Sequence, residues 1–117
     1  MSYIDRIGEV AGKDVSILKH KDAEYGGSWC KRGGVGAFMM LCRKWDRLET
    51  ALNPHAVAGD LREAPISVTI GKPIPAYDIL EAGEQDSREE GILDDIGDLR
   101  RYLLLVEAEI RERQDGK

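Results

Sequence analysis

Acidic residues gather at the start of the segment DDIGDLRRYLLLVEAEI, residues 94–110, whose apolar residues have helical spacing. Asp94, Asp95 and Asp98 lie close together there, and like charges three or four residues apart on a helix repel by a few tenths of a kcal/mol. A divalent cation would offset this repulsion, because Mg²⁺ prefers oxygen ligands and commonly bridges carboxylates to substrate phosphates. The segment therefore suggests a magnesium site.

The position of these acids around the helix separates them into two groups. The apolar stripe consists of Ile92, Ile96, Leu99, Leu103, Val106 and Ile110. Asp95 lies about 60° from the centre of that stripe and Asp98 about 120° on the same flank. Asp94 lies roughly opposite the stripe and is predicted to be solvated. Asp95 and Asp98 are thus placed where a helix edge meets a crevice.

A second acidic pair occurs on the helix predicted for residues 37–52. Its apolar stripe is Phe38, Leu41, Trp45, Leu48 and Leu52. Glu49 lies about 60° from the centre of the stripe and Asp46 about 120° on the same flank. If the two helices packed antiparallel with their apolar stripes face to face, their acidic flanks would lie on opposite sides of the pair. One metal site that uses both flanks therefore requires that the helices are rotated about their axes, or that the carboxylates come from two subunits. Either pair alone is more commonly a set of surface charges.

The elements that must position these acids are mostly helical. Apolar spacing predicts a helix over residues 3–25, a glycine-rich loop over 26–36 and a helix over 88–113 that begins with a capping box from Ser87 to Glu90. Residues 53–86 contain the β-prone ISVTI between prolines, which indicates either a short strand or hairpin or an irregular flap. We expect one domain, residues 1–117, with an all-α fold: an antiparallel helical bundle with an irregular or short β insertion.

Composition limits the partners. A net charge of −5 argues against nucleic acid, which needs clustered Lys and Arg. The chain contains no run of about 20 apolar residues that could span a membrane, and its start is unlike a signal peptide, so we expect a cytoplasmic protein. Broad apolar stripes in a short chain favour a homo-oligomer, with dimer and tetramer both open.

Three segments together carry a resemblance to a known family. At DDIGDLRRYLLL the chain resembles the MazG-like all-α nucleoside triphosphate pyrophosphohydrolases, whose third core helix has an ExxD-type motif; Asp95 and Asp98 fill its acidic positions. KDAEYGGSW, residues 21–29, and KWDRLE, residues 44–49, are similar to the nucleotide-modification-associated branch, which is common in phages. The similarity covers residues 17–52 and 88–106. The ExxE pair of the second helix is replaced here by Asp46 and Glu49.

The resemblance implies Mg²⁺- or Mn²⁺-dependent cleavage of a (deoxy)nucleoside triphosphate to monophosphate and pyrophosphate. The phage-rich branch suggests dGTP or a modified deoxynucleotide as substrate, and the host cytoplasm of an infected cell as location. Metal ions neutralise the triphosphate and lower the pKa of the attacking water, while a carboxylate orients or deprotonates that water. On this basis Glu49, Asp95 and Asp98 are the expected catalytic residues, and the same three with Asp46 are the expected metal ligands.

Substrate contacts are expected from four further residues. Lys21, Lys44 and Arg47 would bind phosphates, although each could equally lie along its helix with a solvated head. Trp29 would stack on the base, with a core anchor as the equal alternative, whereas Tyr102 is expected in the core.

Two other functions remain compatible with the sequence. One is a nucleotide-binding protein without turnover, which the missing ExxE pair permits. The other is a helical interaction protein whose acids are only solvated. The glycine-rich CKRGGVG, residues 30–36, lacks the GK[ST] ending of a P-loop and does not indicate a phosphate cradle.

Overall fold

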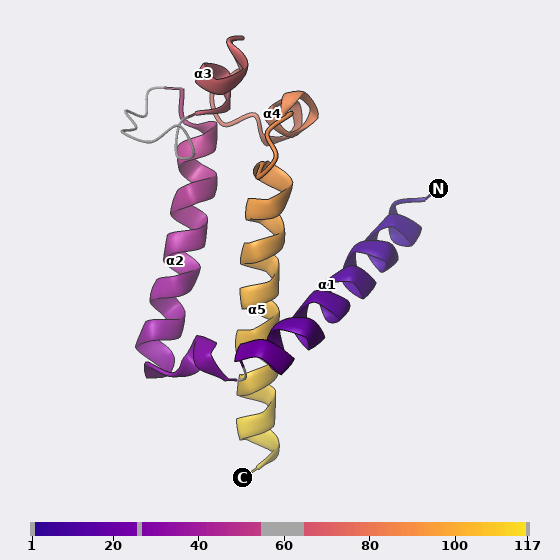
Figure 1. Cartoon of the computed structure of the whole chain (residues 1–117), viewed down its shortest axis with the longest axis vertical. Coiled ribbons are helices and arrows are strands. Elements are labelled where there is room, and N and C mark those ends of the chain that lie inside the picture. The colour runs from indigo at the N-terminus through magenta and orange to yellow at the C-terminus, as the bar shows by residue number, and fades with distance from the viewer. Residues whose placement is uncertain (1, 26, 55–64, 117) are drawn as a thin grey trace.

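The regular elements in the part of the chain that the structure describes are all helices (Figure 1). This computed structural model describes residues 2–25, 27–54 and 65–116, apart from the side chains of residues 23–25. The helices are α1 (Tyr3–Tyr25), the 3₁₀ helix η1 (Ser28–Cys30), α2 (Gly33–Leu52), α3 (Ile66–Ile70), α4 (Ile79–Gln85) and α5 (Ile92–Asp115). The all-α prediction is therefore confirmed for the described residues.

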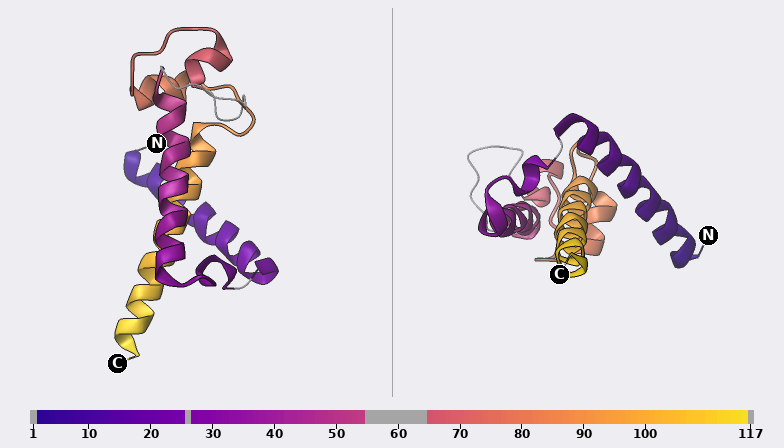
Figure 2. Two further views of the ribbon diagram at one scale, coloured as in Figure 1. Left: turned by 90° about the vertical axis from the view of Figure 1, so that its left-hand side faces the viewer. Right: turned by 90° about the horizontal axis from the view of Figure 1, so that it is seen from below.

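Helices α2 and α5 form a long antiparallel pair, and α1 crosses α5 at an angle (Figures 1 and 2). The N-terminal half of α1 diverges from the pair, so that its end stands alone in Figure 1. The molecule is correspondingly extended, with a radius of gyration of 16.4 Å. A compact chain of this length would have a radius of about 13 Å.

The hydrophobic core lies at one end of the α2–α5 pair. Its buried members come from the end of α2, from α3 and α4, and from the start of α5: Leu48, Ala51, Ile66, Ala82 and Ile92. The segment between α2 and α5, which the family resemblance leaves unmatched, thus supplies part of the core. Packing of α3 and α4 over the pair holds the start of α5 in place.

The β-prone run ISVTI forms helix α3, so the predicted strand or hairpin is wrong for these residues. Pro65 precedes the helix, and Gly71 ends it in the left-handed conformation with φ of 68°. Proline at the start and glycine past the end are the usual limits of a helix. Burial of Ile66 in the core stabilises the single turn, and this packing outweighs the β propensity of the sequence.

Two predicted helix boundaries also differ from the structure. Helix α2 begins at Gly33, where φ is 76°, so the predicted loop over 26–36 includes η1 and the first turn of α2. Helix α5 begins at Ile92 rather than at 88. Its start is capped by Asp86, which accepts a hydrogen bond from the Ile92 amide at 2.6 Å, and by Asp94, which accepts one from the Gly91 amide at 3.0 Å. The predicted capping box at residues 87–90 is therefore wrong.

Candidate functional site

Ion pairs join the C-terminal half of α2 to the first two turns of α5. Lys44 Nζ lies 3.4 Å from Asp98 Oδ2, and Arg47 Nε lies 3.7 Å from Asp95 Oδ1. Lys44 also lies 5.7 Å from the centre of the Tyr102 ring, within the range of a cation–π contact. The basic flank of α2 therefore faces the acidic flank of α5.

A buried carboxylate joins α1 to the same charges. Asp14 accepts hydrogen bonds from Arg100, with Nη2 at 2.8 Å, and from Arg101, with Nη1 at 3.1 Å. Arg101 also donates to Asp98 at 2.9 Å. Lys44, Asp98, Arg101, Asp14 and Arg100 thus form one chain of charges across three helices, here called the Asp14 network.

Electrostatics favour the ionised form of Asp14 despite its burial. The Arg100 hydrogen bond holds the pKa of Asp14 below its ordinary value of 3.8, and the contribution of Arg101 is in the same direction. Burial acts against them by raising the pKa. At neutral pH Asp14 is therefore an ionised counter-charge for the two arginines.

A glycine inside α5 makes room for this network. A Cβ on Gly97 would lie 2.8 Å from Nη1 of Arg101, closer than side-chain atoms normally approach. Glycine within a helix costs about 1 kcal/mol relative to alanine. Here it lets the Arg101 side chain fold back along α5 to reach both Asp14 and Asp98.

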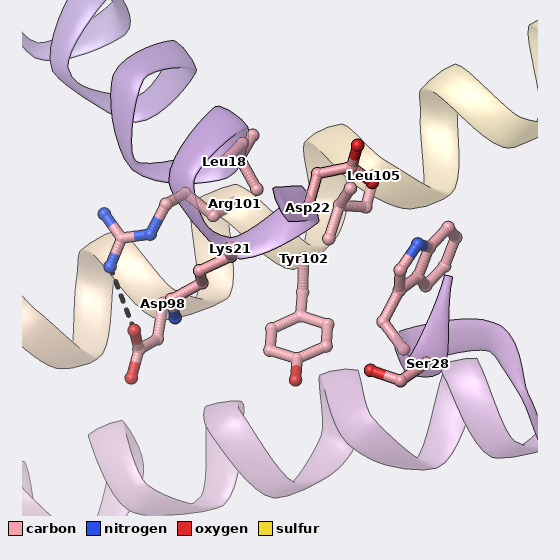
Figure 3. A pocket seen from close by; sticks show the side chains of 9 residues that line it. Leu18, Lys21, Asp22, Ser28, Asp98, Arg101, Tyr102 and Leu105 are labelled. Atoms are coloured by element: carbon pink, nitrogen blue, oxygen red, sulfur yellow. Dashed lines mark hydrogen bonds and ion pairs between the residues drawn. The ribbon is translucent and has the colours of Figure 1, made fainter. Parts of the chain in front are cut away.

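Next to the Asp14 network lies a pocket of about 300 Å³, between α1, η1 and α5 (Figure 3). Three residues predicted to act on substrate or metal line it: Lys21, Trp29 and Asp98. The remaining lining residues are Leu18, Asp22, Ser28, Arg101, Tyr102 and Leu105. In Figure 3 Asp98 and Arg101 meet at one side of the pocket, and the Tyr102 ring points toward α2. Tyr102, expected in the core, is thus a pocket residue.

Asp95 is the most deeply buried of the four predicted metal ligands. Burial raises the pKa of Asp95 above 3.8, and the nearby Arg47 and Arg88 only partly oppose this effect. The neighbouring charges of Asp98 and Asp94 raise the pKa further. A buried carboxyl group with a raised pKa is a candidate proton acceptor.

The other two predicted metal ligands, Asp46 and Glu49, do not line this pocket. Asp46 is exposed, and Glu49 lines a different hollow with Trp45 and Leu52. Helix α2 is rotated so that Lys44 and Arg47 face α5, and this rotation turns the acidic flank away. Within residues 2–25, 27–54 and 65–116, no group of three or more His, Cys, Asp or Glu side chains is placed to hold a metal ion. The four acids therefore do not form one site within a single chain.

The two acids on α5, Asp95 and Asp98, suit a metal ion that is also bound by the substrate. Asp98 lines a pocket together with the cations Lys21 and Arg101, and Asp95 lies one helical turn before Asp98 on α5. Mg²⁺ is often held by one or two carboxylates together with substrate phosphates, and not by a cage of protein ligands. The donor set fits that kind of site, provided that a substrate supplies further oxygen ligands.

Several residues of the site were missed by the sequence analysis, above all Asp14, Arg100 and Arg101. Asp14 does carry a signal, because it interrupts the apolar spacing of α1 at a position that falls on the stripe. A buried charge on a stripe requires a partner. Its partners lie 86 and 87 residues away, so helical spacing within α1 gives no indication of them.

Comparisons with protein families, with curated proteins and with solved structures found no match to this chain. None of the described helices is both long enough and apolar enough to cross a membrane.

Proposed function

We propose that this protein is a metal-dependent (deoxy)nucleoside triphosphate pyrophosphohydrolase. The observation that supports this most is the composition of the pocket, where two cations, two aromatic rings and two carboxylates come together: Lys21, Arg101, Trp29, Tyr102, Asp22 and Asp98. Cations suit a triphosphate, and aromatic rings suit a base. A volume of about 300 Å³ is at the lower end for small-molecule sites, and the pocket opens to solvent.

Substrate binding would change the pairing of Asp98. Lys44 and Arg101 both contact Asp98 in the free protein. Phosphate oxygens compete for those two cations, because phosphate carries more charge than a carboxylate and accepts bidentate arginine contacts. The nucleotide would therefore release Asp98 to act as a metal ligand at the time when phosphates are present.

Asp95 and Asp98 would hold the divalent ion together with the phosphates. When bound, such an ion neutralises the triphosphate and lowers the pKa of the attacking water. Water attacks the α-phosphorus, the bond to the bridging oxygen breaks, and pyrophosphate leaves. Asp95 would accept the proton from water, because its burial makes it more basic than a solvated aspartate.

A second function is favoured by one feature of the site. Asp95 and Asp98 are already paired with cations, while Asp46 and Glu49 lie away from them. A protein of this kind could bind a nucleotide through Lys21 and Arg101 without hydrolysing it.

The experiment measures pyrophosphate and monophosphate release from ribo- and deoxynucleoside triphosphates, including dGTP and modified deoxynucleotides, with Mg²⁺, Mn²⁺ or chelator. We expect metal-dependent release of both products. Asp98→Asn should lower the rate by at least about 100-fold, since a ligand of the reacting centre is lost. Asp94→Asn is the matched control, because Asp94 is exposed on the same helix and does not line the pocket, so this substitution should leave the rate nearly unchanged.

Each other outcome has a distinct meaning. Nucleotide binding by calorimetry without product release would support the binding protein. Neither binding nor release would contradict both functions. Equal effects of Asp98→Asn and Asp94→Asn on the rate would show that the pocket is not the reacting centre.

A further inference from the structure

Arg101 is held by two carboxylates in the free protein. Its Nη1 donates to Oδ1 of Asp14 on α1 at 3.1 Å, and its Nη2 donates to Oδ1 of Asp98 on α5 at 2.9 Å. The Nε–H group takes part in neither bond, so the guanidinium keeps a further donor for a ligand. Arg101 and Asp98 line the pocket, where Figure 3 shows them joined, whereas Asp14 does not line it. One of the two carboxylates therefore holds Arg101 from outside the pocket.

Asp14 is the more firmly placed of these two carboxylates. Only 1% of Asp14 is exposed, and it also accepts hydrogen bonds from Nε and Nη2 of Arg100. The side chain of Asp98 is 28% exposed, and its second oxygen contacts the flexible Lys44 chain. A bidentate arginine contact fixes the orientation of a carboxylate as well as its position. Asp14 is therefore the fixed point from which Arg101 is oriented.

A polyanion in the pocket would displace Asp98 from Arg101 and leave Asp14 in place. Phosphate oxygens compete with Asp98 for the guanidinium, because phosphate carries more charge and accepts bidentate arginine contacts. A ligand in the pocket does not compete for Asp14, which is buried outside it. This step rests on the proposed function, in which Asp98 turns from the cations to the metal ion. Asp14 is then the carboxylate that still orients Arg101.

The charges around Asp14 suit this role. The single negative charge of Asp14 faces the positive charges of both Arg100 and Arg101, which leaves one positive charge in excess. Arg100 does not line the pocket, so its charge is placed to offset that of Asp14. Asp14 can therefore hold Arg101 without cancelling the attraction of Arg101 for an anion.

We propose that Asp14 is a positioning residue for polyphosphate binding, which holds the Arg101 guanidinium at the wall of the pocket so that its remaining donors meet the phosphates of the substrate. An arginine side chain loses rotamer freedom when a ligand orders it. A guanidinium that Asp14 has already ordered avoids most of this loss. The same bond docks α1 on α5, so the docking of α1 and the affinity for polyphosphate are coupled.

The first test measures binding of inorganic tripolyphosphate to the full chain by isothermal titration calorimetry, with chelator present so that metal binding does not contribute. Asp14→Ala should raise the dissociation constant by about 10-fold or more, because the ligand must then order Arg101 itself. Charge alone predicts the opposite change, since the substitution removes a negative charge near the pocket. Asp5→Asn is the matched control, because it removes one negative charge at an exposed position of the same helix and should leave the dissociation constant unchanged.

The second test determines whether Asp14 acts through Arg101. Arg101→Lys keeps the positive charge but lacks the planar fork that can join a carboxylate to a phosphate. In the Arg101→Lys background, Asp14→Ala should therefore raise the dissociation constant by less than about 2-fold, against about 10-fold in the wild type. Equal weakening in the two backgrounds would overturn the proposal.

A third comparison separates positioning from a general loss of stability. Ile66 is completely buried in the core and does not line the pocket, so Ile66→Val should lower the stability and leave tripolyphosphate binding unchanged. If circular dichroism shows that Asp14→Ala does not fold, Asp14→Asn replaces it in both tests, because asparagine keeps the shape of the side chain. With a hydrolysed nucleotide, the same substitution should raise KM with little change in kcat.

The outcomes distinguish this proposal from the proposed function. Tripolyphosphate binding that weakens in Asp14→Ala but not in Asp5→Asn supports the positioning role, even if no nucleotide is hydrolysed and the proposed function fails. Binding that is unchanged or tighter in Asp14→Ala overturns the positioning role, and pyrophosphate release by the wild type would still support the proposed function. A wild-type protein that binds no tripolyphosphate would overturn the positioning role as well.

Discussion

Arg101 of α5 donates one hydrogen bond to Asp14 of α1 at 3.1 Å and another to Asp98 of its own helix at 2.9 Å. The same guanidinium therefore ties the crossing of α1 over α5 to the carboxylate at the edge of the pocket. Because Asp98 also contacts Lys44 of α2, the position of three helices and the charge of the candidate site depend on one set of contacts.

The loss of Asp14 should destabilise the fold. In Asp14→Asn the guanidinium groups of Arg100 and Arg101 lose their buried counter-charge, and we expect the free energy of unfolding to fall by about 2–3 kcal/mol. Chemical denaturation followed by circular dichroism measures this loss. Asp5→Asn, at an exposed position of the same helix, should cost no more than about 1 kcal/mol. Equal losses in the two variants would contradict the structural role of Asp14.

Acid should weaken the protein through Asp14 and Asp86. Hydrogen bonds from Arg100 lower the pKa of Asp14; for Asp86, burial raises the pKa but hydrogen bonds from Arg88 and Ile92 outweigh it. A folded-state pKa below the unfolded value of 3.8 gives stability that is present above pH 3.8 and is lost as pH falls through the folded pKa. The stability difference between wild type and Asp14→Asn should therefore be constant near neutral pH and shrink below pH 3.8. A difference that grows in acid would contradict this sign.

Gly97→Ala should fail to stabilise α5. Alanine improves helix propensity by about 1 kcal/mol, but its Cβ would lie 2.8 Å from Arg101 Nη1 and push the guanidinium off Asp14 and Asp98. Gly8→Ala in α1 is the matched control, since a Cβ there meets no atom within 4 Å and should raise the free energy of unfolding by about 0.5–1 kcal/mol. Denaturation of both variants measures the contrast. A similar gain for Gly97→Ala would show that Arg101 moves without cost.

Asp95→Asn should lower the activity of the protein without lowering its stability. Burial raises the pKa of Asp95, so the folded state prefers the uncharged form and loses stability as pH rises through that raised pKa. The uncharged asparagine avoids this loss, and we expect the variant at pH 7 to be as stable as wild type or more stable by up to about 1 kcal/mol. Its gain over wild type should vanish well below pH 3.8. Pyrophosphate release should fall sharply, and an unchanged rate would remove Asp95 from the mechanism.

Trp29 should govern binding of the base more than the rate of chemistry. Stacking of a base on an aromatic ring contributes about 1–3 kcal/mol, so Trp29→Ala should raise KM by about 10- to 100-fold with little change in kcat. Trp29→Phe should retain part of the affinity. Steady-state kinetics with one nucleotide measures both parameters. A lower melting temperature with unchanged KM would instead identify Trp29 as a packing residue, since it also lines the apolar hollow beside Phe38.

The periodicity of apolar residues predicted the long helices correctly but did not predict the short helix α3. The spacing of Ile4, Ile7 and Leu18 correctly predicted a helix over Tyr3–Tyr25, because a long amphipathic pattern has few alternatives. ISVTI was predicted as a strand or flap and forms a helix, because contacts of Ile66 in the core decide the conformation of such a short run.

Part of the candidate site was also predicted from the sequence. Lys21, Trp29 and Asp98 were predicted to act together, and they line one pocket. Asp46 and Glu49 were predicted as partners of Asp95 and Asp98, but the structure separates the two pairs. The helical spacing gives the angle of each side chain from its own stripe, and it carries no information on how far the stripe is turned from the neighbouring helix.

The sequence by itself determined the all-helical character, the amphipathic stripes and the acidic flank of α5, because these depend on residues three or four positions apart along one helix. Only the tertiary structure decided that Lys44 and Arg47 face that flank and that Asp14 binds Arg100 and Arg101. These features depend on the rotation and crossing of whole helices, which are set by packing between residues far apart in the chain.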